Sequence, residues 1–212
     1  MAFKRSRSSI GALVHANDFI MRLRPMTPSR IEPLPRAAER IVLRRLRATD
    51  LADFQSYRAD PEVGRYQGWT PVPSSVAHVF LTDMSAVKFT AVDVWFQLGI
   101  ADRLTDRLIG DIGFSICGPE HQHAELGFTL SRPAQGQGLA TEAVRAMIDL
   151  LFEHTGVARV VSLVHVENHA CVRLLQRVGM TLVGTVDSVF RGAPCVEYVY
   201  MIWRKQPTSP RH

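Results

Sequence analysis

Cysteine is scarce in this chain of 212 residues, which contains only Cys117, Cys171 and Cys195. An odd number of widely spaced cysteines without a C-x-x-C pair argues against a disulfide framework and favours reduced thiols in a cytoplasmic protein. Long hydrophobic runs are also missing, since no apolar stretch approaches the ~18 residues that a membrane-spanning helix needs. With 46% hydrophobic and 21% charged residues, the chain can instead bury the core of one globular domain.

Acidic side chains are sparse at the start of the chain. Residues 1–36 carry seven basic and two acidic residues, which accounts for the whole formal net charge of +5. The charge of the remainder is balanced, so it gives no indication of nucleic-acid binding. We expect residues 1–37 to form a disordered, basic, proline-containing tail, followed by one domain over 38–205 and a short tail over 206–212. The Arg/Ser-rich start also fits a transit peptide or a membrane-surface arm.

The domain has the hydrophobic patterns of a mixed α/β fold. The order of elements predicts a mixed sheet of about seven strands with helices on both faces, because only one strand–helix–strand crossover occurs. One predicted helix has an apolar stripe made by Val76, Val79, Phe80, Met84 and Val87. The predicted strands are 40–47, 94–100, 108–116, 123–130, 159–166, 181–186 and 196–203, and the predicted helices are 50–58, 74–88, 139–154 and 169–178.

Glycines gather in one turn between a strand and the longest predicted helix. Gly136 and Gly138 stand immediately before Leu139, where that helix is expected to begin. The first N–H groups of a helix have no internal acceptor and lie at the positive end of its dipole, and glycines allow a phosphate oxygen to approach them closely. The pattern is therefore typical of an anion-binding turn, although a plain chain reversal would use the same residues.

Two common phosphate-binding motifs fit this turn poorly. A Walker A loop needs Gly-Lys-Ser/Thr, and the sequence has no such tripeptide. The dinucleotide fingerprint is closer, because Gly136-x-Gly138-x-x-Thr141 lacks only the third glycine and Glu167 follows the next strand. That fingerprint normally opens a series of parallel βαβ units, whereas this chain has one crossover, so a dinucleotide oxidoreductase remains the third hypothesis.

The segment Gln135-x-x-Gly138-x-Ala140 resembles the Q/R-x-x-G-x-G/A motif of the GNAT acyltransferase superfamily. A second segment, Asn168-His-Ala-Cys171-Val-Arg-Leu-Leu175-Gln-Arg-Val-Gly179-Met180, resembles the family's N-x-x-S-x-x-x-x-E-K-x-G-F pattern. The segments 41–50 and 60–63 are similar to the RimJ/RimL-like branch of N-acetyltransferases. The resemblance covers roughly residues 38–204 and implies a mostly antiparallel sheet whose central strands splay apart.

The resemblance also implies a set of residues that contact the cosubstrate acetyl-coenzyme A (acetyl-CoA). The amides of the glycine turn would hold the pyrophosphate, the strand before it would pair with the pantetheine arm, and Asn168 would hydrogen-bond that arm or simply cap its helix. These expected cofactor-binding residues are Phe128, Thr129, Leu130, Gln135, Gly136, Gln137, Gly138, Leu139, Ala140, Thr141 and Asn168.

Glu125 and Cys171 are the candidate catalytic residues. Glu125 lies on the strand beside the expected cofactor and could deprotonate the attacking amine, but a solvent-facing or salt-bridged carboxylate is the alternative. Cys171 stands where the family usually has serine and could protonate the leaving thiolate, or serve as small apolar filler. Many family members carry a tyrosine at the position of Leu175, so the general acid stays open.

We therefore expect an N-acetyltransferase that moves an acetyl group from acetyl-CoA to a primary amine by direct attack. The acceptor could be a protein N-terminus, an amino acid, a polyamine or an amine antibiotic, and the alternative function is a non-catalytic acyl-CoA-binding module. His121, His123, His165 and His169 suggest a zinc site, but no cysteine or aspartate completes a ligand set, so we expect no metal. We expect no nucleic-acid or membrane partner and leave a homodimer open.

Overall fold

The protein is described here by a computed structural model that places residues 33–118 and 122–205. Its strands are β1 (Arg36–Ala37), β2 (Ile41–Arg45), β3 (Phe96–Asp102), β4 (Leu108–Cys117), β5 (His123–Leu130), β6 (Arg159–His165), β7 (Thr181–Phe190) and β8 (Ala193–Trp203). Its helices are α2 (Leu51–Arg58), α3 (Pro61–Gly64), α4 (Ser74–Ala86), α5 (Leu139–His154) and α6 (His169–Arg177), with 3-10 turns η2 (Ala48–Asp50) and η4 (Arg132–Ala134). None of the helices in these two stretches is long and apolar enough to cross a membrane.

The strands form one open sheet in the order β1-β2-β3-β4-β5-β6-β8-β7. Within the described ranges, β5 and β6 are the one parallel pair of named strands, and α5 connects them. The predicted mixed, mostly antiparallel sheet is confirmed, with eight strands instead of about seven. The additional strand is β1, which falls inside the predicted tail: Arg36 pairs with Leu43 of β2, and its guanidinium binds the Glu153 carboxylate at 2.8 and 2.9 Å.

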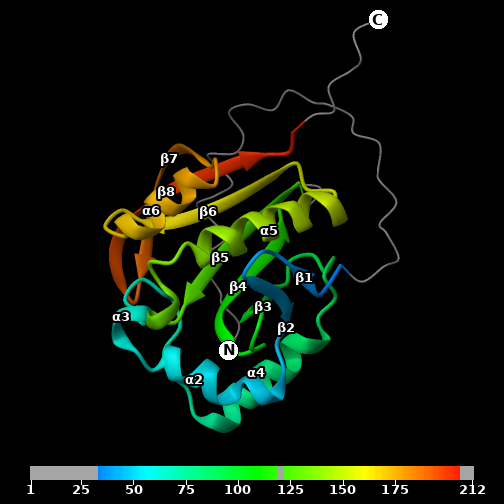
Figure 1. Cartoon of the computed structure of the whole chain (residues 1–212). Helices are drawn as coiled ribbons and strands as arrows, with labels where there is room; N and C mark the ends of the chain where they lie inside the picture. The colour runs from blue at the N-terminus through cyan, green and yellow to red at the C-terminus, as the bar shows by residue number, and fades with distance from the viewer. Residues whose placement is uncertain (1–32, 119–121, 206–212) are drawn as a thin grey trace, which may run out of the picture.

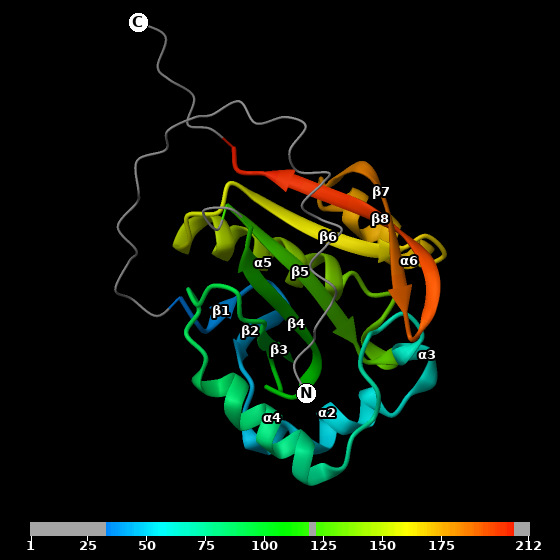
Figure 2. The same ribbon diagram turned by 180° about the vertical axis from the view of Figure 1, so that it is seen from behind.

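Helices cover both faces of the sheet, as the sequence predicted (Figures 1 and 2). Alternate residues of β4 point to opposite faces, so Ile112 packs in the core under α5 while the neighbouring Asp111 faces α2 and receives a hydrogen bond from Tyr57. Val144 and Met147 of α5 are fully buried in the first core. The sheet therefore carries an α5–α6 layer on one side and an α2–α4 layer on the other.

The apolar stripe predicted for α4 is confirmed for Phe80, Met84 and Val87, which pack against the two cores, and is wrong for Val76 and Val79. Val76 and Val79 are 48% and 57% exposed, whereas Ala77 and Leu81 are fully buried. The neighbouring helix α2 sets the buried face, because its Phe54 stacks on Phe80 with ring centroids 5.6 Å apart. The buried face of α4 therefore combines Ala77 and Leu81 with Phe80 and Met84 of the predicted stripe.

The centre of the sheet splits where β5 and β6 diverge (Figure 2). The two strands pair only from His123 with Arg159 to Glu125 with Val161, although β5 continues to Leu130 and β6 to His165. A polar contact closes the narrow end, where the Ser162 hydroxyl donates to the Leu126 carbonyl oxygen at 2.9 Å. Beyond it, the facing backbone edges of β5 and β6 do not pair with each other, and this unpaired stretch between the two strands is called the gap below.

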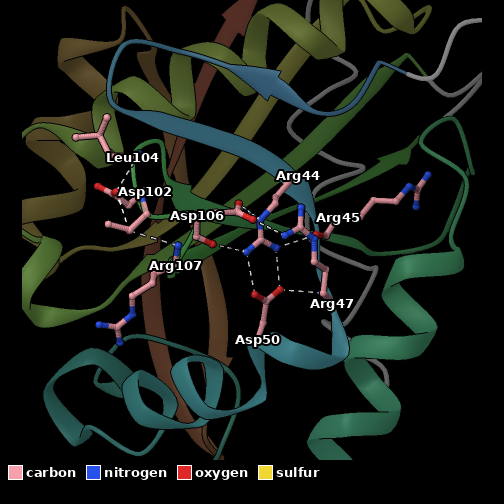
Figure 3. Close-up of polar contacts among 9 residues, drawn as sticks. Arg44, Arg45, Arg47, Asp50, Asp102, Leu104, Asp106 and Arg107 are labelled. Atoms are coloured by element: carbon pink, nitrogen blue, oxygen red, sulfur yellow. Dashed lines mark hydrogen bonds and ion pairs between the residues drawn. The ribbon is translucent and has the colours of Figure 1, made fainter.

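A buried arginine ties β2 to the turn η2 that leads into α2 (Figure 3). Arg44 is 3% exposed, and its guanidinium forms two 2.8 Å hydrogen bonds to the Asp50 carboxylate and a third of 2.8 Å to Asp106. Asp50 also accepts from the Arg47 backbone N–H at 2.8 Å, so one carboxylate both neutralises Arg44 and caps the turn into α2. This network fixes the α2 layer on the sheet.

Arg44→Met should destabilise the protein by roughly 3–5 kcal/mol, because Asp50 would keep a buried and unpaired charge. The free energy of unfolding in urea measures the effect. Arg107→Met is the matched control, since the Arg107–Asp53 pair is 2.7 Å long but its arginine side chain is 72% exposed, and such pairs contribute about 0–1 kcal/mol. Equal losses in the two variants would contradict a buried, mutually dependent Arg44–Asp50 pair.

Candidate active site

The glycine turn lies at the wide end of the gap between β5 and β6. Gln135 folds back, and its side-chain amide donates to the Leu130 carbonyl oxygen at 2.9 Å. Gly136 and Gly138 then adopt φ values of 75° and 82°, a left-handed conformation that other residues rarely take. This conformation turns the chain directly into α5, whose first residue is Leu139 as the sequence predicted.

The backbone N–H groups of the turn point away from protein acceptors. Among the described residues, none accepts a hydrogen bond from the N–H groups of residues 136–141, and the first α5 amide with a partner is that of Glu142, which donates to the Gly138 oxygen at 3.1 Å. Six consecutive donors at the positive end of a 16-residue helix form a site for an anion. A diphosphate fits the chemistry of this donor set.

An arginine that the sequence reasoning missed holds the turn in place. Arg40 donates from Nη1 to the Gln137 carbonyl oxygen at 2.9 Å and from Nε to Glu142 at 3.1 Å. Glu142 in return accepts from the backbone N–H of Arg40 at 2.6 Å and of Ile41 at 3.2 Å. The turn and α5 are therefore clamped to β2, a connection between distant segments that no local pattern reveals.

Along the edge of β5 that borders the gap, the backbone N–H and C=O groups of every second residue face the gap. The Ser131 N–H donates to the Ile109 oxygen of β4, so the backbone groups of every second residue before Ser131 also face β4. The backbone groups of the intervening residues, Leu126, Phe128 and Leu130, therefore face the gap. The hydrogen bond from the Ser162 hydroxyl of β6 to the Leu126 oxygen agrees with this orientation. Thr129, predicted with its neighbours as a cofactor contact, pairs with Asp111 of β4, so its backbone points away from the gap. The strand thus offers two of the three expected residues to a ligand.

Side chains already contact the carbonyl oxygens on this edge. Besides Ser162 on Leu126, the Gln67 amide donates to the Phe128 oxygen at 3.2 Å and Gln135 to the Leu130 oxygen. In contrast, the N–H groups of Phe128 and Leu130 have no acceptor in the part of the chain that the structure covers. The gap therefore presents a row of donors to a ligand that carries carbonyl groups.

Glu125 lies at the narrow end of the gap. It is the last β5 residue that pairs with β6, and it stands opposite Ser115 of β4, so its half-buried side chain is on the α2–α4 face of the sheet. Trp95 approaches the same face, where a Cβ at Gly113 would come within 2.5 Å of its indole and one at Gly127 within 3.5 Å. The two glycines make room for an aromatic ring next to Glu125's strand.

A buried hydrogen-bond chain anchors that indole. Trp95 Nε1 donates to Gln97 at 2.6 Å, Gln97 donates to Asp111 at 2.6 Å, and the Tyr57 hydroxyl donates to the other Asp111 oxygen at 2.5 Å. Burial raises the pKa of Tyr57 well above its usual value, and the adjacent Asp111 raises it further, so the phenol stays a donor. No local sequence pattern indicates this chain, because Tyr57, Gln97 and Asp111 lie on three separate elements and Trp95 precedes β3.

Asn168 and Cys171 lie at the start of α6. The Asn168 Oδ1 accepts from the Cys171 backbone N–H at 3.2 Å, so Asn168 is the N-cap of this helix. Cys171 packs against the main core, and burial raises the pKa of its thiol to about 12. The environment is therefore that of apolar filler, and the thiol is a weaker acid than an ordinary cysteine.

The segment after α3 crosses the mouth of the gap. Gln67 binds β5, while the Tyr66 hydroxyl donates to the Glu167 oxygen beyond β6 at 3.4 Å and its ring lies 5.3 Å from that of His165. Arg191, in the two-residue turn between β7 and β8, donates to the Gly64 oxygen at 2.8 Å. This strap, residues 64–69, joins both sides of the gap to the β7–β8 hairpin.

The histidines do not assemble into a metal site in the described ranges. No group of three His, Cys, Asp or Glu residues there could hold an ion. His165 accepts from the Glu167 N–H, and His123 contacts the Cys117 sulfur at 3.2 Å. His121 lies outside the described residues.

Comparisons with known proteins point to one family, the GNAT acetyltransferases. The acetyltransferase (GNAT) domain model matches residues 40–181. The uncharacterized N-acetyltransferase p20 of Bacillus licheniformis is 29% identical over 164 residues, which cover 77% of this chain and 91% of that protein.

Two solved structures share the fold. An acetyltransferase of the GNAT family from Bacillus anthracis superposes with a TM-score of 0.70 at 21% identity, covering 79% of this chain and 96% of that one. RimL, a ribosomal L7/L12 alpha-N-protein acetyltransferase solved with coenzyme A, gives a TM-score of 0.69 at 15% identity, covering 80% and 97%.

Proposed function

Because the chain belongs to the GNAT family of acetyltransferases, we propose that it transfers an acetyl group from acetyl-CoA to a primary amine by direct attack in a ternary complex. The observation that carries this proposal is the row of six unpartnered N–H groups over residues 136–141 at the start of α5. These donors complement the negative charge of the diphosphate of coenzyme A.

The pantetheine arm would continue from the diphosphate into the gap. Its two amide carbonyls would accept from the N–H groups of Phe128 and Leu130, as an added strand would. This path leads the thioester toward the narrow end of the gap, where Leu126 and Glu125 lie. The Asn168 side-chain amide, whose oxygen caps α6, would donate to the same arm.

The chemical requirement is a neutral amine. A lysine-like amine with a pKa near 10.4 costs roughly 4.6 kcal/mol to deprotonate at pH 7, whereas an α-amine near 7.7–8.0 costs about 1 kcal/mol. Glu125 is the proposed base, since it stands on the cofactor strand at the end where the thioester would lie. The Trp95 indole beside it would supply an aromatic surface for the incoming amine.

The acceptor is proposed only as a class. RimL acts on a protein α-amine, and an N-terminal residue in this chain's gap would need the strap at residues 64–69 to admit an extended peptide. Amino acids, polyamines and amine antibiotics need less room. We place a protein N-terminus, with its low deprotonation cost, first among these acceptors.

Cys171→Ala should retain the acetyl-transfer rate within a factor of about three, because a thiol whose pKa is raised to about 12, from about 8.5 for an ordinary cysteine, is a poor proton donor to a departing thiolate. The kcat at pH 7 to 9 measures this. A loss of a hundredfold with unchanged thermal stability would instead establish Cys171 as the general acid.

One experiment separates the proposed enzyme from the alternative of a non-catalytic acyl-CoA-binding module. Thermal shift is measured with acetyl-CoA, coenzyme A and NAD, and thiol release is then followed with a panel of amines. A ligand at a hundred times its dissociation constant stabilises the fold by about 2.7 kcal/mol. Stabilisation by acetyl-CoA without thiol release from any amine would favour the binding module, and stabilisation by NAD alone would exclude both.

A further inference from the structure

A groove with a volume of about 630 Å³ runs along α5 beside the glycine turn. One wall is the connection between β1 and β2, residues 36–40, and the other is the α5 face that starts at Gly138. Arg177, from the end of α6, closes the groove near its α5 N-terminal end. The groove and the anion-binding turn therefore share Gly138.

The charges in this groove are not balanced at the end next to Gly138. Arg36 is paired with Glu153 and Arg40 with Glu142, but within the described part of the chain neither Arg145 nor Arg177 has a carboxylate partner. Of the acidic residues that line the groove without an ion pair, Asp149 lies about three helical turns from Gly138, and Glu39 lies on the opposite wall. The α5–α6 side of the groove next to the turn therefore carries two arginines without a carboxylate partner among the described residues.

Both arginines are held where they could receive an anion. Arg177 Nη1 donates to the Thr141 hydroxyl at 3.3 Å, which places its guanidinium at the first turn of α5. Arg145 Nη2 donates to the Arg177 carbonyl oxygen at 2.9 Å, so it also fixes the end of α6. Each guanidinium uses one of its five N–H groups in these contacts and keeps the others for a ligand.

We propose that Arg177, supported by Arg145, binds the 3′-phosphate of coenzyme A and makes the protein discriminate between coenzyme A and its 3′-dephospho form. This inference rests on the proposed function. Coenzyme A is one continuous chain, so with its diphosphate on the α5 amides and its pantetheine arm in the gap, the adenosine must leave on the other side of the diphosphate. The groove begins there, at Gly138, and its arginines have the fork geometry that suits a phosphate dianion.

The test compares the dissociation constants of coenzyme A and 3′-dephospho-coenzyme A for the full-length chain by isothermal titration calorimetry, which needs no knowledge of the acceptor. The wild type should bind coenzyme A at least tenfold more tightly. In Arg177→Gln this preference should fall below threefold, while the affinity for the dephospho form stays unchanged. Arg177→Lys should keep part of the preference because the charge remains.

Arg173→Gln is the matched control, since Arg173 is an exposed arginine one turn earlier on α6 that does not line the groove. It should keep the full preference. Equal wild-type affinities for the two forms, an equal loss in both arginine variants, or equal weakening of both ligands by Arg177→Gln would overturn the proposal. Failure of the proposed function looks different, because then neither form would bind.

Discussion

Gly138→Asp should strongly weaken the binding of acetyl-CoA, while Gly138→Asn should weaken it only modestly. Gly138 is the N-cap of α5 with φ of 82°, and asparagine and aspartate are the residues other than glycine that best tolerate this conformation. The two variants have the same size, so they differ only in charge. The aspartate carboxylate would lie within reach of the free amides of α5 and of Arg40, whose Nη2 is 3.4 Å from a Cβ at this position, and would occupy the diphosphate site itself.

Calorimetry with acetyl-CoA measures both dissociation constants. We expect the aspartate variant to bind on the order of a hundredfold more weakly than the asparagine variant, from repulsion between carboxylate and diphosphate at close range. Thermal melting without ligand checks that both variants fold. Equal affinities in two folded variants would show that the diphosphate does not lie at the start of α5, and the proposed function would lose its main support.

Glu125→Gln should lower kcat by roughly 10²–10⁴-fold and leave the KM for acetyl-CoA nearly unchanged, as expected for a general base that does not hold the cosubstrate. The substitution keeps the shape of the side chain and removes its capacity to accept a proton at neutral pH. The rate of thiol release is measured as a function of pH with the best amine of the panel.

The pH profile distinguishes a base from a structural carboxylate. A base produces a rise in wild-type rate with pH that the variant lacks, whereas a structural carboxylate would lower stability and leave the shape of the profile intact. Glu153→Gln is the control, because Glu153 is an exposed carboxylate at the far end of α5. A Glu125 variant with wild-type kcat would remove Glu125 from the mechanism.

The sequence was informative where local chemistry determines structure. The bounds of α5 agree with prediction because Gly138, which takes a left-handed conformation, starts the helix, and an amphipathic pattern continues to His154. The bounds of β5 also agree, since it alternates polar and apolar residues between two loops. Both elements flank the turn, so local sequence patterns suffice to locate the candidate diphosphate site.

The rest of the site depends on contacts between distant segments. Ser162 and Gln67 cap carbonyl oxygens 36 and 61 residues away along the chain, and Arg40 clamps a turn 97 residues away. No periodicity or motif encodes such pairs, because each member alone is an ordinary polar residue. For the same reason β1 was missed: two residues, Arg36 and Ala37, form no pattern, and their place in the sheet follows from pairing with β2.

The capped carbonyls along β5 have a consequence for the protein without its cosubstrate. A strand with bare donors and acceptors invites a foreign strand and is a starting point for aggregation. Here a second chain that approached β5 would find each gap-facing oxygen on Leu126, Phe128 and Leu130 already engaged by a side chain. Of the gap-facing groups that the structure describes on these residues, only the N–H groups of Phe128 and Leu130 remain for pairing, so a slender ligand with carbonyl groups can bind, whereas a foreign strand that needs both donors and acceptors is disfavoured at the centre of the split sheet.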